Sequence, residues 1–135
     1  MKVLLIDDDP VSHLINEKFI SIATDDPELE IISYLKADEA LDYILRYIRS
    51  NSPDSLRIFL DLNMPNFNGW DFLNYLEELD DNKLSVFILT SSVSNIDRQK
   101  ARKYTSVKEF LVKPLSIPLL KNIFIQRKEL ASERT

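Results

Sequence analysis

The 135-residue chain contains no cysteine, which excludes both disulfide bonds and metal sites built from thiolates. A chain of this length does not need disulfides, because it can bury roughly two thirds of the surface that its unfolded form exposes. At its start, Met1–Asp7, only four apolar residues precede the first carboxylate, too few for a signal peptide or a membrane span. These absences predict a soluble protein of the cytoplasm.

Glycine is almost absent as well, since Gly69 is the only one in the chain. Glycine adopts a left-handed backbone at little cost, so we expect Gly69 to occupy a turn that requires this conformation. The sequence also lacks repeats, low-complexity tracts and linkers. It therefore predicts a single domain over residues 1–131, followed by a short tail at 132–135 and no output domain.

Charge is unevenly distributed along the chain. Residues 1–93 carry 7 Lys or Arg against 18 Asp or Glu, whereas residues 94–135 carry 10 against 4. The basic C-terminal part is either an ordinary solvated helix or a docking face for an acidic partner. No nucleic-acid recognition motif accompanies the charge, so nucleic acid is not an expected partner.

Short apolar runs recur along the chain, and each interval between them has helical spacing. The runs are Val3–Ile6, Leu29–Tyr34, Ile58–Leu60, Val86–Leu89 and Phe110–Val112. Strands that alternate with helices in this way predict an α/β fold, a parallel sheet with helices on both faces.

Five helices are expected between and after these strands. In the first, which begins at Pro10 and ends before Asp25, the spacing places Val11, Ile15, Phe19 and Ile22 close to one apolar face. His13 in this helix has no companion ligands for a metal and no kinase core beside it, so we expect an ordinary surface residue. The others are predicted over Asp38–Arg49, over Trp70–Leu79, after a cap at Ser94, and from a cap at Ser116 to about Leu130.

The first apolar run ends abruptly in three carboxylates, Asp7, Asp8 and Asp9. A strand buried on both faces delivers its last residues to the carboxyl edge of the sheet, where open α/β sheets bind ligands. Carboxylates held together there repel by about 4 kcal/mol per pair at an effective dielectric constant of ~20. The cluster therefore favours a divalent metal site, with a merely solvated acidic surface as the alternative.

Polar residues also follow the later strands. Asp61 ends the third run and is followed by Leu62-Asn63-Met64-Pro65, while Thr90 and Lys113 end the fourth and fifth. If the first and third strands are neighbours, Asp61 faces the Asp7–Asp9 cluster. A hydroxyl and an ammonium group then join the carboxylates at one edge.

In this pattern the sequence resembles the receiver domain of two-component response regulators, over nearly the whole chain. The resemblance rests on Asp7-Asp8, Asp61 with Met64-Pro65 and Gly69, Thr90, and Lys113-Pro114 preceded by Phe110. It implies a flavodoxin-like, doubly wound sheet with strand order 2-1-3-4-5, as in stand-alone chemotaxis-type receivers.

The resemblance implies that Asp61 accepts a phosphoryl group from a histidine kinase or a histidine phosphotransfer protein. Asp8, Asp61 and the main-chain carbonyl of Asn63 would bind Mg²⁺, and Asp7 would contact the ion through water. Mg²⁺ and Lys113 would neutralise the charge of the phosphoryl group in transfer. Such a protein is a signalling domain that assists its own phosphorylation and dephosphorylation, and is not counted as an enzyme.

The resemblance also implies a switch. Thr90 would donate a hydrogen bond to phosphorylated Asp61 and move inward, and the ring of Phe110 would follow. The face made by the fourth helix, the fifth strand and the fifth helix would then rearrange to bind a downstream protein or a second copy of the chain. The alternative for Phe110 is an ordinary half-buried strand aromatic. Asn63 and Ser92 are expected to tune the phosphoryl lifetime through water access.

Two other functions remain open from the residues. Asp7-Asp8-Asp9-Pro10-Val11 also fits the signature of haloacid dehalogenase-type phosphatases, with Asp7 as nucleophile, Asp9 as acid–base group, and Thr90 and Lys113 binding phosphate. Such a phosphatase needs a second acidic pair for Mg²⁺ late in the chain, and no such pair stands at a strand end here. Asp61 would also have no role in it. The other is a receiver-like module that binds partners without phosphorylation. Ser91 and Ser106-Val107 depart from the residues common in receivers, which bears on loop geometry rather than chemistry.

Overall fold

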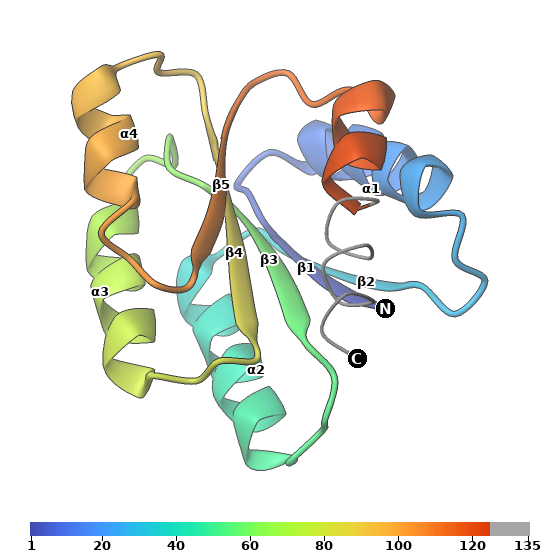
Figure 1. Ribbon diagram of the computed structural model, residues 1–135, viewed down its shortest axis with the longest axis horizontal. Helices are drawn as coiled ribbons and strands as arrows, with labels where there is room; N and C mark the ends of the chain where they lie inside the picture. The colour runs from blue at the N-terminus through green and yellow to red at the C-terminus, as the bar shows by residue number, and fades with distance from the viewer. Residues whose placement is uncertain (125–135) are drawn as a thin grey trace.

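The computed structural model describes residues 1–124, and its sheet has five parallel strands in the order β2-β1-β3-β4-β5 (Figure 1). The strands are β1 (Lys2–Ile6), β2 (Glu30–Tyr34), β3 (Leu56–Asp61), β4 (Leu84–Thr90) and β5 (Val107–Val112). The predicted class and strand order are confirmed. The last three strands extend beyond the apolar runs, because polar residues also take part in their pairing.

Helices connect the strands on both faces of the sheet. They are α1 (Pro10–Thr24), α2 (Ala37–Arg49), α3 (Gly69–Leu79) and α4 (Asn95–Ala101), and a further helix begins at residue 117 and is described to residue 124. Both expected caps form, because Ser94 Oγ accepts from the Asp97 amide at 3.4 Å and Ser116 Oγ accepts from the Leu119 amide at 3.2 Å. The predicted continuation to Leu130 and the tail at 132–135 lie outside the described residues.

Each face of the sheet has its own apolar core. Helices α2, α3 and α4 cover one face, while α1 and helix 117–124 cover the other (Figure 1). Along β1, Leu4 and Ile6 enter the first core, whereas Val3 and Leu5 enter the second. Successive strand residues point to opposite faces, so two buried faces require the continuous apolar runs seen in the sequence.

The apolar face expected for α1 is its buried face only at Phe19, which is half-buried and packs against the second core. Val11, Ile15 and Ile22 are 60%, 48% and 46% exposed, whereas Ile20 is fully buried and His13 is only 7% exposed. Apolar residues lie nearly all round this helix, so their spacing did not determine its rotation about its own axis. The helix therefore presents an exposed apolar strip, called here the α1 strip, made of Val11, Leu14, Ile15 and Ile22.

The expected left-handed turn at Gly69 was also wrong. Gly69 is the buried first residue of α3 and has no positive φ, whereas Asn66 in the preceding loop does, at 57°. A Cβ added to Gly69 would collide with Leu62 Cδ2. The glycine therefore allows α3 to begin close against the residue that follows Asp61.

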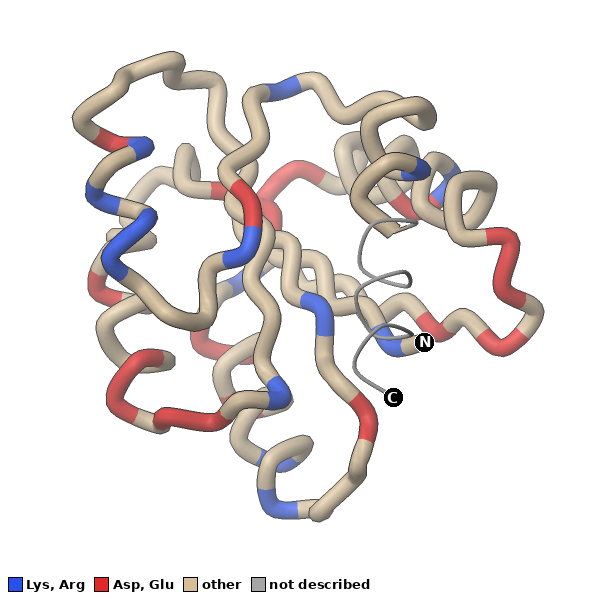
Figure 2. The backbone as a smooth tube through the Cα atoms, viewed as in Figure 1, with Lys and Arg blue, Asp and Glu red and all other residues tan. Residues whose placement is uncertain are grey.

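Charge separates in space as well as in sequence. Figure 2 shows basic residues along α4 and acidic residues after β1 and at the end of β3. Among residues 1–124, no helix combines the length and the apolar character needed to cross a lipid bilayer.

Candidate functional site: an acidic pocket at the carboxyl edge of the sheet

Three carboxylates meet where β1 and β3 end. Asp7, Asp8 and Asp61 each place an oxygen within 4.8 Å of the others; Asp7 and Asp61 are buried, and Asp8 is exposed. The strands are direct neighbours with Ile6 opposite Leu60, so the residues that follow must face each other. As predicted, Asp61 lies beside the first acidic run, but only beside two of its three carboxylates, those of Asp7 and Asp8.

The third carboxylate of that run has another use. Asp9 is the N-cap of α1, where Oδ1 accepts from the Val11 amide at 3.0 Å and Oδ2 accepts from Ser12 Oγ at 3.1 Å. Its own amide donates to Asp7 Oδ1 at 3.0 Å, which orders the loop around the pocket. Asp9 is thus committed to shaping the loop, and this weakens the acid–base role given to it by the phosphatase alternative.

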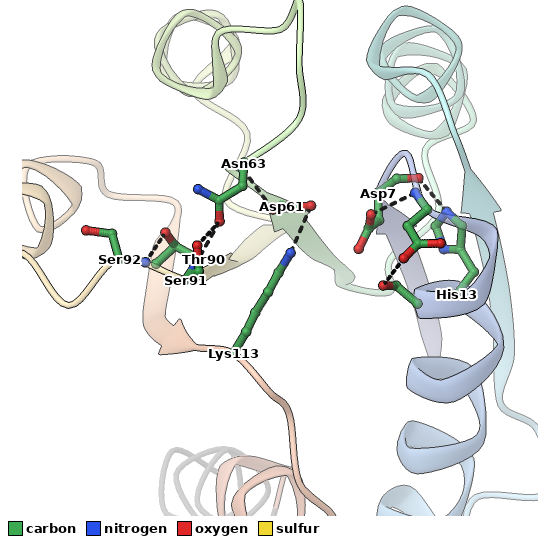
Figure 3. A network of polar contacts seen from close by, with 10 residues as sticks. Asp7, His13, Asp61, Asn63, Thr90, Ser91, Ser92 and Lys113 are labelled. Carbon is green, nitrogen blue, oxygen red and sulfur yellow. Dashed lines mark hydrogen bonds and ion pairs between the residues drawn. The ribbon is translucent and has the colours of Figure 1, made fainter.

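Lys113 reaches the pocket from the loop after β5. Its Nζ lies 3.0 Å from Asp61 Oδ2, and its main-chain amide donates to Thr90 O at 2.8 Å, which fixes the base of the side chain (Figure 3). Asp61 Oδ1 accepts from the Asn63 amide at 2.8 Å. A buried carboxylate is thereby held between an ammonium group and an amide, with its orientation fixed.

Thr90 ends β4 beside this pair and is 2% exposed. Its Oγ1 accepts from the Ser92 amide at 3.0 Å. Next to it, both the amide and the hydroxyl of Ser91 donate to Asn63 Oδ1, at 2.8 and 3.3 Å. The Asn63 side chain therefore ties the loop after β3 to the loop after β4. Sequence reasoning missed this link, although the resemblance had marked Ser91 as a departure from its pattern.

Ser92 points elsewhere. Its hydroxyl donates to Asp97 Oδ2 at 3.3 Å and accepts from the Ser94 amide at 3.1 Å, and in Figure 3 it is directed away from Asp61. These contacts hold the first turn of α4. A role in phosphoryl lifetime stays a prediction for Ser92, as it does for Asn63.

Phe110 is half-buried on β5 and contacts α4. The guanidinium carbon of Arg98 lies 5.0 Å from the centroid of its ring, within the range of a cation–π interaction. Arg98 was not singled out from the sequence, since no local pattern connects it with Phe110. The contact joins the predicted switch aromatic to the helix that the switch would move.

The electrostatics of the pocket favour a cation. Burial raises the pKa of the Asp7 carboxyl above its usual 3.8, and the nearby Asp61 carboxylate adds to this, while the Asp9 amide, Lys113 and His13 oppose it. Asp7 Oδ2 is buried and has no hydrogen-bond partner within the described part of the chain. Clustered carboxylate oxygens with an unused buried acceptor are the donor set that Mg²⁺ prefers. The residues present therefore fit this ion.

The family model of the response regulator receiver domain matches residues 3–124. This chain belongs to that family. Receivers are signalling domains of two-component systems and bind Mg²⁺ at an acidic pocket, to which the cluster of Asp7, Asp8 and Asp61 corresponds.

Similar solved structures agree with this assignment. A two-component response regulator from Cytophaga hutchinsonii is 29% identical, covers 93% of this chain and 94% of its own, and has a TM-score of 0.76. A two-component response regulator from Legionella pneumophila is 25% identical, with coverages of 96% and 98% and a TM-score of 0.74. The chemotaxis protein CheY4 of Vibrio cholerae, 23% identical with coverages of 93% and 96% and a TM-score of 0.67, shares the fold. No curated protein matches the chain.

Proposed function

We propose that this receiver accepts a phosphoryl group on Asp61 from a histidine kinase or a histidine phosphotransfer protein. Mg²⁺ would be bound by Asp8, Asp61 and the main-chain carbonyl of Asn63, with Asp7 in contact through water. The observation that carries the proposal is the buried Asp61 carboxylate, 3.0 Å from Lys113 Nζ and beside two further carboxylates.

The transfer needs little covalent chemistry from the protein. A carboxylate oxygen of Asp61 attacks phosphorus, the bond from phosphorus to the donor nitrogen breaks, and an acyl phosphate forms. Lys113 would donate hydrogen bonds to the phosphoryl oxygens, and Thr90 would do so from the end of β4. Bound Mg²⁺ supplies the remaining positive charge at these oxygens.

Two surfaces suit the partners of such a cycle. The α1 strip begins at Val11, two residues after Asp9, and exposed apolar residues beside a reaction site favour contact with a protein surface. This strip is proposed to receive the phosphoryl donor.

Because such donors obtain their phosphoryl group from ATP, we expect the cycle to run in the cytoplasm.

The second surface is proposed for the downstream protein or a second copy of the chain. It lies where α4 meets β5, in a groove of about 150 Å³ lined by Arg98, Arg102, Lys108 and Phe110 among others. Its basic character favours an acidic partner. The Arg98–Phe110 contact lies within it, so inward movement of Phe110 would change its shape.

The test is intact mass after incubation with a small-molecule phosphodonor and Mg²⁺. Wild type is expected to gain one phosphoryl group, while Asp61→Asn and an EDTA-treated sample gain none. An adduct that persists in Asp61→Asn would contradict the assignment. Failure of wild type with both this donor and a histidine-phosphorylated protein, under conditions where Mg²⁺ binds, would favour the module that works without phosphorylation.

A further inference from the structure

We propose that His13 is a positioning residue for the acidic pocket: its ring fixes the main chain of Asp7 and thereby holds Asp7 and Asp8 where a divalent cation can bind. The inference deepens the proposed function and rests on it. His13 comes from the first turn of α1, and its side chain lies directly beside the Asp7 loop (Figure 3).

The ring makes two hydrogen bonds through one nitrogen. His13 Nε2 lies 2.7 Å from the main-chain oxygen of Asp7 and 3.1 Å from that of Tyr34. Carbonyl oxygens only accept hydrogen bonds, so Nε2 must carry a proton and donate to both. The ring therefore bridges the ends of β1 and β2.

These contacts fix both polar groups of the Asp7 main chain. The Asp7 amide donates to Tyr34 O at 3.2 Å, while the Asp7 carbonyl accepts from His13. The peptide groups on the two sides of Asp7 are thus held by separate partners. Because the second of these peptide groups leads directly into Asp8, the directions of both carboxylates are set by the same bonds.

A reason for such an anchor lies in the pocket itself. Without a cation, the carboxylates of Asp7, Asp8 and Asp61 repel each other and favour movement of the loop away from β3. Bonds from the body of α1 to the loop oppose that movement. When the loop is already in the binding geometry, less of the cation's binding free energy is needed to order it.

Packing alone does not explain a histidine here. His13 is 7% exposed, and its Nδ1 is buried with no hydrogen-bond partner among residues 1–124. A leucine would fill a similar volume without burying an unpaired nitrogen, which carries a cost. The two hydrogen bonds from Nε2 offset this cost, and a leucine could not form them.

The test compares Mg²⁺ affinity in wild type, His13→Leu, His13→Gln and Ile20→Val by isothermal titration calorimetry. His13→Leu is expected to weaken Mg²⁺ binding by roughly 10-fold, the lower end of the usual effect of removing a residue that orients a ligand. His13→Gln, whose amide group can donate to the same carbonyls, is expected to retain most of the affinity. Ile20→Val is the matched control, because Ile20 is buried on the same helix but belongs to the second core.

Two readouts without metal separate positioning from general stability. Amide hydrogen exchange at Asp7 and Asp9 is expected to accelerate in His13→Leu but not in Ile20→Val, with the β3 and β4 amides unchanged. In wild type, long-range ¹⁵N–¹H spectra are expected to show the ring proton on Nε2. A ring protonated on Nδ1 alone, with no proton on Nε2, would overturn the proposal even if no variant folded.

The remaining outcomes are distinct. Equal Mg²⁺ affinity and equal loop exchange in His13→Leu and Ile20→Val would overturn the role of His13 while leaving the proposed function in place. Absence of Mg²⁺ binding by wild type would count against the proposed function and against the cation part of this inference. The exchange and tautomer measurements would still decide whether the histidine fixes the loop.

Discussion

Two buried carboxylates of the pocket, Asp7 and Asp61, have unequal partners. Asp61 pairs with Lys113 and the Asn63 amide, whereas one oxygen of Asp7 has no hydrogen-bond partner in the described part of the protein. A buried carboxylate that lacks compensation destabilises the folded state when it is ionised. The unpartnered oxygen of Asp7 therefore lowers the stability of the metal-free protein, but it leaves an acceptor available to a bound cation.

Asp7→Asn is expected to make the metal-free protein more stable at neutral pH. Burial raises the pKa of Asp7 above 3.8 in the folded state, so the folded state binds this proton more tightly than the unfolded state does. The ionised group thus costs stability once pH rises through the raised pKa, and the cost vanishes below the unfolded value of 3.8. Urea unfolding in EDTA across this range measures the gain. A gain that grows on acidification would contradict the expectation.

Asp8→Asn tests the metal site at an exposed position, where the substitution leaves the core intact. Mg²⁺ at about ten times its Kd is expected to raise the free energy of unfolding of wild type by about 1.4 kcal/mol. The variant is expected to lose this gain, whereas Asp54→Asn, exposed in the loop before β3, keeps it. Thermal or urea unfolding with and without Mg²⁺ provides the comparison, and an equal gain in both variants would exclude Asp8 as a ligand.

At the scale of elements, α4 is a helix of seven residues held by aromatic contacts. Lys100 Nζ lies 4.5 Å from the centroid of the Trp70 ring on α3, and Trp70 stacks on Tyr104 with centroids 6.2 Å apart. On the other side, Arg98 covers Phe110. A switch that moves Phe110 would therefore disturb contacts on both sides of α4.

The fluorescence of Trp70 should report that movement, because this is the only tryptophan in the chain. Phosphorylation is expected to change its emission in wild type, since the Lys100 and Tyr104 contacts on the ring would alter. Asp61→Asn treated in the same way is the control for direct effects of the phosphodonor. Unchanged emission of fully phosphorylated wild type would indicate that α4 keeps its position against α3.

For the whole molecule, the fold could be predicted because both faces of the sheet are buried. That burial leaves apolar runs such as Val3–Ile6 in the sequence, and polar residues where the runs stop. What the sequence did not determine was the rotation of α1, because apolar residues such as Val11 and Ile20 occur on opposite sides of the helix. The burial of His13 follows from that rotation and was missed with it.

Within the site, the meeting of Asp7, Asp8 and Asp61 followed from strand order alone. Contacts between loops, such as Ser91 with Asn63, depend on backbone paths that no short pattern encodes. Gly69 was recognised as special, but the reason was a close approach to Leu62 rather than a left-handed turn. Sequence patterns thus identified the residues of the site, whereas packing in three dimensions determined the contacts that hold those residues.

The position of the phosphoryl group in the chain tests the role of Asp61 directly. After incubation with a phosphodonor and Mg²⁺, borohydride reduces an acyl phosphate on aspartate to homoserine, which peptide mass spectrometry can place. Homoserine is expected at position 61 alone, and none is expected without Mg²⁺. Homoserine at position 7, or a phosphate retained on a serine or threonine, would contradict it.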